Sequence, residues 1–305
     1  APETLSRVVT VDGGYIKGGA NYRANDNSNF FFNVGQIMRP PSFDGVFPNA
    51  DYDFEEADEI LNESFTSFEL GYGFRSSNFK GTLNAYHTVW GDRTLRRSTS
   101  IDDQGVRIIY SGVEQTHQGI EAEMTWYPSS RLRVKGMASL GNWKYTKNFE
   151  GEAYYIDNNQ SAGTTGTLYL DGVKIGDAAQ TVLYLGLDYK LSSKLSLDLD
   201  MMSYDDLHGR FGPLDNEFNS ANNRGSIKLP SFGTTDLGAT YQFSFLGYET
   251  LARLNVNNLF DKEYISQSQT NFHNEGGRTW NGVNVENNVY FGKGTTWNLS
   301  LNLRF

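Results

Sequence analysis

The sequence predicts an all-β fold, a transmembrane antiparallel β-barrel with about eleven strands in this chain. Three observations support this prediction. Segments of ten or more residues alternate apolar and polar side chains, the connections between them alternate between short and long, and no run approaches the ~20 apolar residues of a transmembrane helix. Mean hydropathy is only −0.52. This value is compatible with a barrel, because alternation dilutes the apolar residues of its strands.

The last eleven residues show the alternation without a miss. Apolar side chains occupy every second position, at Trp297, Leu299, Leu301, Leu303 and Phe305. Polar side chains fill the positions between them, so the two faces of the strand differ in character. Such a strand suits a barrel, with lipid on one face and a polar interior on the other. The edge strand of a soluble sandwich would show the same pattern.

The same period of two recurs along the chain. The predicted strands span residues 13–24, 29–39, 64–75, 79–97, 106–127, 131–148, 179–190, 194–204, 231–245, 249–259 and 295–305. The apolar positions of the first, second, third and fifth strands include, in that order, Ile16 and Tyr22, Phe30 and Phe32, Phe68 and Leu70, and Ile120 and Met124. In the next five they include Leu132 and Val134, Leu183 and Leu185, Leu197 and Leu199, Leu237 and Tyr241, and Ala252 and Leu254. Strands four to six exceed the length needed to cross a bilayer and are expected to project above it.

The connections follow a rule that a soluble sandwich has no reason to keep. Tight turns follow strands one, three, five, seven and nine, and a moderate connection follows strand four. Long polar connections follow strands two, six, eight and ten, at residues 40–63, 149–178, 205–230 and 260–294. Outer-membrane barrels have this alternation, with short periplasmic turns and long extracellular loops. If the last strand ends in the periplasm, the first must begin outside. Either residues 5–11 form a further strand or the chain is the C-terminal part of a larger barrel, and residues 5–11 fit better as the top of the first strand.

Composition excludes several classes of function. The chain has no cysteine, which excludes disulfides and thiolate metal sites. Its formal net charge is −10 and its pI is near 4.9. An acidic chain is unsuited to a nucleic-acid partner, which requires a basic face. We find no nucleophile–base set, so no enzyme activity is predicted.

Three motifs resemble those of the TonB-dependent outer-membrane receptors. Residues 255–264, NVNNLFDKEY, resemble the family signature near the end of the penultimate strand, including Asn258, Leu259, Phe260, Asp261 and Tyr264. Residues 118–123 with 127–132, and residues 39–47, resemble two further segments, and the terminal Phe305 matches the signal read by the barrel-assembly machinery. The loops are similar to those of receptors from Bacteroidetes.

The resemblance implies a 22-stranded barrel with a plugged lumen. On this basis residues 1–305 are expected to be the C-terminal part of the barrel, with the plug domain and the first barrel half outside the chain. The implied function is import of a scarce nutrient across the bacterial outer membrane with TonB-derived energy. The implied partners are the TonB complex through the plug, outer-membrane lipid, the barrel-assembly machinery and a surface substrate-binding lipoprotein. Siderophore, oligosaccharide, peptide and cobalamin remain open as ligands, and a passive porin or adhesin-like barrel is the alternative function.

Candidate ligand-binding residues fall in two groups. The first is a basic aromatic cluster high on the fourth strand, at Trp90, Arg93, Arg96 and Arg97, which could hold an anionic ligand. The second lies in the predicted external loops, at His208, His273, Arg278 and Trp280. No resident cofactor is expected, although acidic residues between Asp51 and Glu59 could supply oxygen ligands to Ca²⁺.

Overall fold

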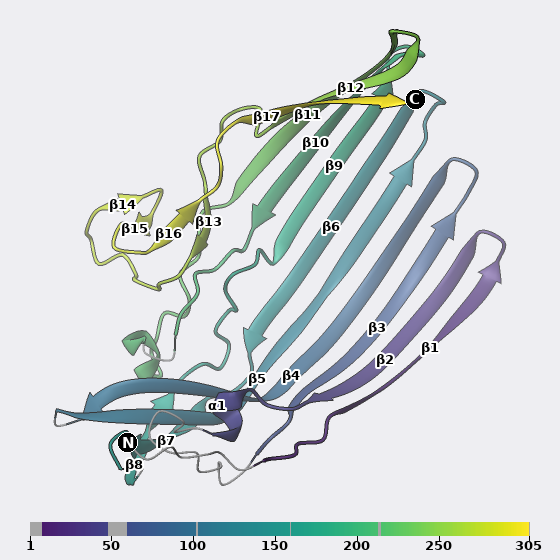
Figure 1. Ribbon diagram of the computed structural model, residues 1–305. Helices are drawn as coiled ribbons and strands as arrows, with labels where there is room; N and C mark the ends of the chain where they lie inside the picture. Colours follow the sequence, from purple (N-terminus) through teal and green to yellow (C-terminus); the bar gives the residue numbers. More distant parts are fainter. Residues whose placement is uncertain (1–7, 48–59, 102, 159, 213–214, 305) are drawn as a thin grey trace.

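Eleven strands follow one another in a single antiparallel sheet that curves into a trough (Figure 1). The computed structural model describes residues 8–47, 60–101, 103–158, 160–212 and 215–304. The first six strands of the sheet are β1 (Gly14–Asn25), β2 (Ser28–Arg39), β3 (Glu63–Arg75), β4 (Phe79–Ile101), β5 (Gln104–Trp126) and β6 (Leu132–Tyr145). The sheet continues with β9 (Thr181–Lys190), β10 (Leu195–Asp205), β11 (Phe232–Phe245), β12 (Tyr248–Asn257) and β17 (Thr296–Arg304).

The remaining elements lie in the connections. A hairpin of β7 (Phe149–Tyr155) and β8 (Ser161–Leu168) joins the sheet through β5. Four short strands pair within the last long connection: β13 (Ile265–Ser268) with β16 (Val289–Phe291), and β14 (Thr279–Trp280) with β15 (Val283–Asn284). Two single turns of helix complete the set, α1 (Phe43–Val46) and η1 (Asn216–Asn219). Neither helix, nor any other in the described ranges, is long and apolar enough to cross a membrane.

The structure confirms the antiparallel all-β prediction, and each of the eleven predicted strands is present in the main sheet. It differs from the prediction around the sixth strand. β4 and β5 each run for 23 residues, but β6 ends at Tyr145 and does not follow them. Beside residues 106–110 of β5, β7 stands in place of β6: Val106 pairs with Tyr155 and Tyr110 pairs with Gly151. The sequence analysis predicted a long connection over 149–178 and missed the strands β7 and β8 within it.

The two ends of the sheet differ as the connection lengths predict. The tight turns gather at one end, together with the end of β17, and the long connections gather at the other (Figure 1). We call these the turn end and the loop end. β1 starts at the loop end and runs to the turn end, as predicted. β1 and β17 form the two borders of the trough, and every residue of both strands is exposed.

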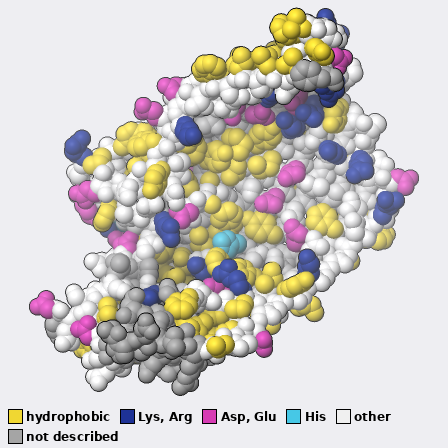
Figure 2. All heavy atoms as spheres, viewed as in Figure 1, with side chains coloured by type: hydrophobic (Ala, Val, Ile, Leu, Met, Phe, Trp, Pro, Cys, Tyr) yellow, Lys and Arg dark blue, Asp and Glu magenta, His cyan; other side chains and the backbone are white. Residues whose placement is uncertain are grey.

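Alternation gives the sheet an apolar outer face and a polar inner face. Outer side chains remain exposed in large numbers, including Leu70 (60%), Leu183 (46%) and Leu299 (58%). Figure 2 shows the hollow of the trough, where side chains of both charges are scattered among apolar ones. Glycines let large inner side chains lie flat on this wall. A Cβ on Gly71 would stand 1.9 Å from Phe31 Cζ on the neighbouring strand.

The buried core lies in the loop end instead of in the main sheet. One cluster centres on Val106, Ile108 and Tyr110 of β5 and is covered by Phe149, Leu168, Leu170 and Phe218 from the connections. The second joins Leu207, Ile227 and Leu229 to Ile265 and Val283. The long connections therefore fold as a packed cap, because apolar burial is the main stabilising force available to them.

Candidate functional site

A β-bulge in β4 places the first candidate residues. The pairing of β4 with β5 shifts between Trp90 and Arg93, and Asp92 within the shift has a φ of 58°. The Ser64 hydroxyl donates a hydrogen bond of 2.7 Å to Asp92 Oδ2 and holds this conformation. A bulge changes the direction of the side chains beside it. Here it brings the Arg93 guanidinium over the Trp90 ring, with 3.8 Å from Cζ to the ring centroid.

The Trp90 indole is fixed on the inner face by its neighbours. Its ring stacks on Phe65 of β3 at 4.9 Å and 24°. Its Nε1 donates a hydrogen bond of 3.1 Å to Glu63 Oε2, and the same carboxylate pairs with Arg39. The cation–π contact with Arg93 adds attraction to a ring that is already oriented. The result is a rigid aromatic and cationic surface near the loop end of the interior.

Three further aromatic rings continue this surface across β4, β5 and β6. Trp143 Nε1 donates a hydrogen bond of 2.8 Å to the Tyr86 hydroxyl, and the Trp143 ring lies 5.5 Å from the His117 ring. Gln180, which is 1% exposed, fixes the Trp143 backbone with two hydrogen bonds. Its Oε1 accepts from Trp143 N at 2.7 Å, and its Nε2 donates to Trp143 O at 3.0 Å. We call Phe65, Tyr86, Trp90, His117 and Trp143, with Arg93, the inner aromatic cluster.

The cluster combines two chemical capacities. Flat indole and phenyl faces stack on planar or apolar faces of a ligand. A guanidinium can add charge-assisted hydrogen bonds to carboxylate or other anionic oxygens. Each ring is half-buried, so an edge or face of it stays accessible from the interior.

The bulge also separates the other two arginines of the predicted strand cluster from Trp90. Arg96 and Arg97 pair with Ile109 and Ile108, on the part of β4 that projects beyond the bulge. The side chain of Arg97 is outside the described part of the structure. The sequence placed all four residues together because they are close in the chain. The structure brings Trp90 and Arg93 into contact.

His208 is buried in the cap, with 8% of its surface exposed. Its Nε2 lies 3.1 Å from Asp206 Oδ1, and its Nδ1 lies 3.1 Å from the Ser226 hydroxyl. Asp206 also accepts a hydrogen bond of 3.1 Å from Lys174. Burial alone would raise the pKa of the Asp206 carboxyl, but these bonds outweigh it and lower the pKa. The arrangement ties two connections together, 149–178 and 205–230, and leaves no ring nitrogen of His208 directed at the interior.

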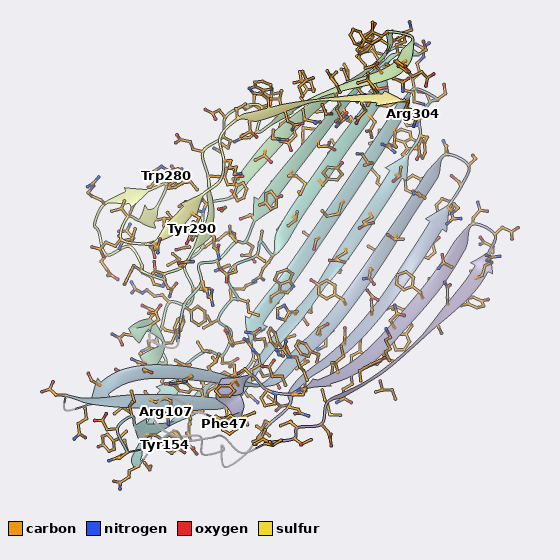
Figure 3. The ribbon with its side chains drawn as sticks, viewed as in Figure 1. Phe47, Arg107, Tyr154, Trp280, Tyr290 and Arg304 are labelled. Atoms are coloured by element: carbon orange, nitrogen blue, oxygen red, sulfur yellow. The ribbon has the colours of Figure 1, made fainter. Side chains whose placement is uncertain are left out.

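The other loop candidates lie on the last long connection. His273 Nε2 contacts the Gly225 carbonyl oxygen at 3.0 Å, which joins this connection to the preceding one. Arg278 is exposed, and the Trp280 ring meets Phe291 edge-on at 5.0 Å and 88°. Figure 3 shows Trp280 with Tyr290 on the small hairpins, well away from Arg107 of β5 and Tyr154 of β7. The loop candidates come from the long connections, whereas the inner aromatic cluster comes from strands β3 to β6.

Within the described residues, no group of three or more His, Asp and Glu side chains could hold a metal ion. The acidic segment from Asp51 to Glu59 lies outside those residues.

Comparison with known proteins assigns the fold to a family. Residues 11–259 match the family described as TonB dependent receptor-like, beta-barrel. The chain belongs to the TonB-dependent receptor family. The predicted family is therefore confirmed, and so is its location in the outer membrane. Members of the family transport ligands and are not enzymes, in agreement with the sequence prediction.

Solved structures of TonB-dependent transporters share the fold. The siderophore receptor PiuA from Acinetobacter baumannii matches with a TM-score of 0.64 and 13% identity, over 93% of this chain and 35% of PiuA. The copper transporter OprC matches with a TM-score of 0.60 and 15% identity, over 96% of this chain and 40% of OprC. The ferric citrate transporter FecA matches with a TM-score of 0.59 and 12% identity, over 95% of this chain and 38% of FecA. The chain thus spans well under half the length of these transporters. No curated protein matches the sequence.

The receptor signature at residues 258–264 has a structural role. Asn258 adopts a φ of 48° and is 5% exposed. Its Nδ2 donates to the carbonyl oxygens of Lys262 and Lys293, both at 3.0 Å, and its Oδ1 accepts from Lys262 N at 2.9 Å. Asp261 Oδ1 accepts from Thr295 N at 2.8 Å. Asn258 and Asp261 therefore fasten the end of β12 to the start of β17.

Other signature residues pack around this junction. The Tyr264 ring stacks on Phe232 at 4.0 Å and covers Gly292. Leu259 N donates to Thr235 O at 2.7 Å, whereas the Phe260 ring is 75% exposed. Phe305 lies outside the described residues.

Sequence reasoning missed Phe65, Tyr86 and Trp143 as members of the inner aromatic cluster. They come from three strands, and nothing in the sequence states which strands are neighbours at which height. One signal was available. Each is a large aromatic residue at a position where the period of two calls for a polar side chain, and such positions face the interior.

Proposed function

We propose that this protein is the barrel part of an outer-membrane receptor that binds an anionic nutrient and imports it with TonB-derived energy. The ligand class we favour is a metal chelate with planar and acidic groups, as in a ferric siderophore. The observation that carries the proposal is the Arg93 guanidinium on the Trp90 ring, 3.8 Å apart, at the interior surface. Structural neighbours named as siderophore and ferric citrate receptors are consistent with this class.

The inner aromatic cluster suits such a ligand for physical reasons. Trp90 and Phe65 are stacked, so their orientation is already fixed before a ligand arrives. A preorganised surface loses little conformational entropy on binding. Arg93 supplies the positive charge, and unlike a lysine it keeps a planar fork of donors for carboxylate oxygens. The loop residues Arg278 and Trp280 remain proposed ligand contacts at the outer entrance.

The wider role also rests on the family. We propose that these residues are the C-terminal part of a 22-stranded barrel whose plug and first half lie elsewhere in the receptor. Coupling to TonB would pass through the plug. We further propose that β17 is recognised by the barrel-assembly machinery, and that a surface lipoprotein delivers substrate to the loops.

The test uses the full-length receptor in outer membranes, with a ferric catecholate siderophore as probe. We expect the Trp90→Ala and Arg93→Gln variants to bind the probe at least about fivefold more weakly, since each removes a contact worth about 1 kcal/mol or more. Probe binding is followed by quenching of tryptophan fluorescence, and import by uptake of radioactive iron with and without functional TonB. Trp126→Phe, on the outer face, is the matched control for loss of an indole.

Two results would contradict the proposal. Import that continues without TonB would remove the energised mechanism. Unchanged probe binding in both cluster variants, with the protein folded, would remove the inner aromatic cluster as the binding surface.

A further inference from the structure

β6 continues past the start of β9 toward the loop end (Figure 1). The pairing of the two strands ends at Leu140 and Thr181, and within the described residues no other strand pairs with β6 beyond this point on that side. Trp143 of the inner aromatic cluster lies on this last part of β6. Backbone N–H and C=O groups left without partners at such an edge are costly. The position of Trp143 therefore depends on what covers the edge.

The side chain of Gln180 takes the place of a strand here. Like a peptide group, its amide accepts from Trp143 N at 2.7 Å and donates to Trp143 O at 3.0 Å. Its Nε2 also donates to the Ile175 carbonyl oxygen at 3.3 Å, and its Oε1 also accepts from Lys174 Nζ at 3.1 Å. An amide side chain has two donor hydrogens and two acceptor lone pairs. All four are therefore used in the Gln180 side chain.

Lys174 determines which way this amide is turned. Its ammonium has three donors, and they meet three acceptors at 3.1 Å each: Gln180 Oε1, Asn142 Oδ1 and Asp206 Oδ2. An ammonium cannot accept a hydrogen bond, so it must face Oε1 of the amide and not Nε2. A flipped amide would place donors against both the ammonium and the Trp143 N–H. Lys174 therefore sets the hydrogen-bond direction along this edge of β6.

The same lysine is anchored in the cap. Asp206 Oδ1 lies 3.1 Å from His208 Nε2, and His208 Nδ1 lies 3.1 Å from Ser226 Oγ. The Ser226 hydroxyl in turn donates to the Lys174 carbonyl oxygen at 2.9 Å. His208 and Ser226 are both buried. The 205–230 connection thus holds both the ammonium and the backbone of Lys174.

On the interior side, the Trp143 ring is confined to the wall. A Cβ on Gly141 would stand 2.8 Å from Trp143 Nε1, so the indole lies close over this glycine. The Tyr86 hydroxyl, which accepts from Trp143 Nε1 at 2.8 Å, lies equally close to the position of a Cβ on Gly119. A ring held this closely moves with its own backbone. A small shift of the β6 edge therefore changes the aromatic face that the interior presents.

We infer that Lys174 and Gln180 are positioning residues of the inner aromatic cluster, which couple the order of the cap to ligand affinity at Trp143. In the proposed function, on which this inference rests, the cluster contacts the ligand. Gln180 is buried, and the three donors of the Lys174 ammonium are occupied within the chain. Both residues therefore act through the Trp143 backbone, and they keep the binding surface preorganised.

The test compares Lys174→Met with Lys144→Met in the full-length receptor in detergent micelles. Lys144 is the matched control because it lies opposite Lys174 in an isolated β-bridge and forms no ion pair within the described residues. We expect Lys174→Met to bind a ferric catecholate siderophore about fivefold more weakly, since it removes the hydrogen bond that directs the Gln180 amide. Lys144→Met should bind like the wild type. Lys174→Arg, which keeps a cation with several donors, should recover part of the affinity.

A second readout separates positioning from a general loss of structure. The receptor is labelled with fluorotryptophan and followed by fluorine NMR, and the Trp143 resonance is assigned by its loss in Trp143→Phe. We expect Lys174→Met and Gln180→Glu to shift this resonance and to leave that of Trp126, on the outer face, in place. Gln180→Glu keeps the acceptors but cannot donate to Trp143 O. It carries the same test if Lys174→Met does not fold, as judged by heat-modifiable gel mobility.

Three results would overturn the inference. The first is unchanged probe binding in folded Lys174→Met when Trp143→Ala binds weakly. The second is an equal loss of binding in Lys144→Met, and the third is a Trp143 resonance that does not move. If Trp90→Ala, Arg93→Gln and Trp143→Ala all bind the probe normally, the proposed function fails instead. The Trp143 resonance alone then decides whether Lys174 positions this ring.

Discussion

At the scale of single residues, the junction at Asn258 shows how one side chain can hold two elements. Both amide hydrogens and the amide oxygen of Asn258 are used, and its backbone N–H donates to Asp236 Oδ1 at 2.7 Å. The residue also accepts a left-handed backbone, which asparagine tolerates better than most residues. Few residue types could meet all of these conditions.

Replacing Asn258 by Asp is therefore expected to destabilise the receptor although the two side chains have the same shape. The carboxylate cannot donate, so the carbonyl oxygens of Lys262 and Lys293 lose their partners, at a cost of about 1–3 kcal/mol for each unsatisfied group. The measurement is the denaturant midpoint of the purified receptor in detergent micelles. Asn288→Asp, in an exposed connection, serves as control, and an unchanged midpoint in Asn258→Asp would refute the role of the amide.

A second residue-scale prediction concerns acid. Arg224 donates to Glu217 at 2.7 Å and also pairs with Glu275 at 2.6 Å, which joins the two last long connections. Its hydrogen bonds lower the pKa of the Glu217 carboxyl from 4.5 to about 2. Because the folded-state pKa is depressed, this contribution to stability is complete above pH 4.5 and is lost as the pH falls through about 2.

Cleavage of the 205–230 connection by pepsin should consequently rise between pH 4.5 and 2 in the wild-type receptor. In Glu217→Gln the connection lacks this charge pair at every pH, so its cleavage should start higher and change less across the interval. Identical profiles for the two proteins would show that the ion pair does not hold the cap.

At the scale of elements, the strands were predictable and the cap was not. The period of two located β3 and β17 within one residue at each end, because each has one apolar and one polar face. β8 escaped prediction because its sequence is rich in Gly and Thr. β7, with the sequence FEGEAYY, does alternate, but only over seven residues at the start of a long polar connection. The contact of Trp90 with Arg93 was foreseen from their closeness in the chain. The bulge that allows this contact, and that places Arg96 and Arg97 farther along β4, was not foreseen. A bulge depends on the register of β4 with β5, which the sequence does not state.

The β7–β8 hairpin should depend on its buried anchor. Phe149 is 4% exposed and packs with Val106, Ile108 and Leu168 in the cap core. Truncation to Ala is expected to cost about 3–5 kcal/mol of local stability, as for buried phenylalanines in general. Hydrogen exchange of β7 and β8 would report the loss, while exchange of β9 to β11 should stay unchanged. Ile16→Ala, at a 73% exposed outer position, is the control, and uniform loosening of the whole sheet would contradict a local role.

At the scale of the whole molecule, the structure reverses the arrangement of a soluble domain. Its apolar side chains cover the outside of the sheet, and the interior holds ion pairs and polar side chains. In the described residues, the clusters of buried apolar side chains lie in the cap. The fold class and the strand order followed from the sequence because alternation and loop length both reflect the membrane. The sheet does not close within this chain, since β1 and β17 do not pair with each other. The sequence prediction did not include a closed barrel formed by this chain alone.

The closing strand offers a matched test of this arrangement. Leu299 is an outer residue near the middle of β17, and Ser300 is its inner neighbour. An arginine on the lipid face near the bilayer midplane costs about 2–4 kcal/mol, whereas an arginine facing the interior can remain hydrated. We therefore expect Leu299→Arg to lower the folded fraction of the full receptor in lipid vesicles, judged by heat-modifiable gel mobility, and Ser300→Arg to leave it near wild type. Equal effects would show that the two faces of β17 are not lipid and interior. The reverse order would place the strand with its faces exchanged, a one-residue slip against β12 that would move every side chain of β17 to the other face.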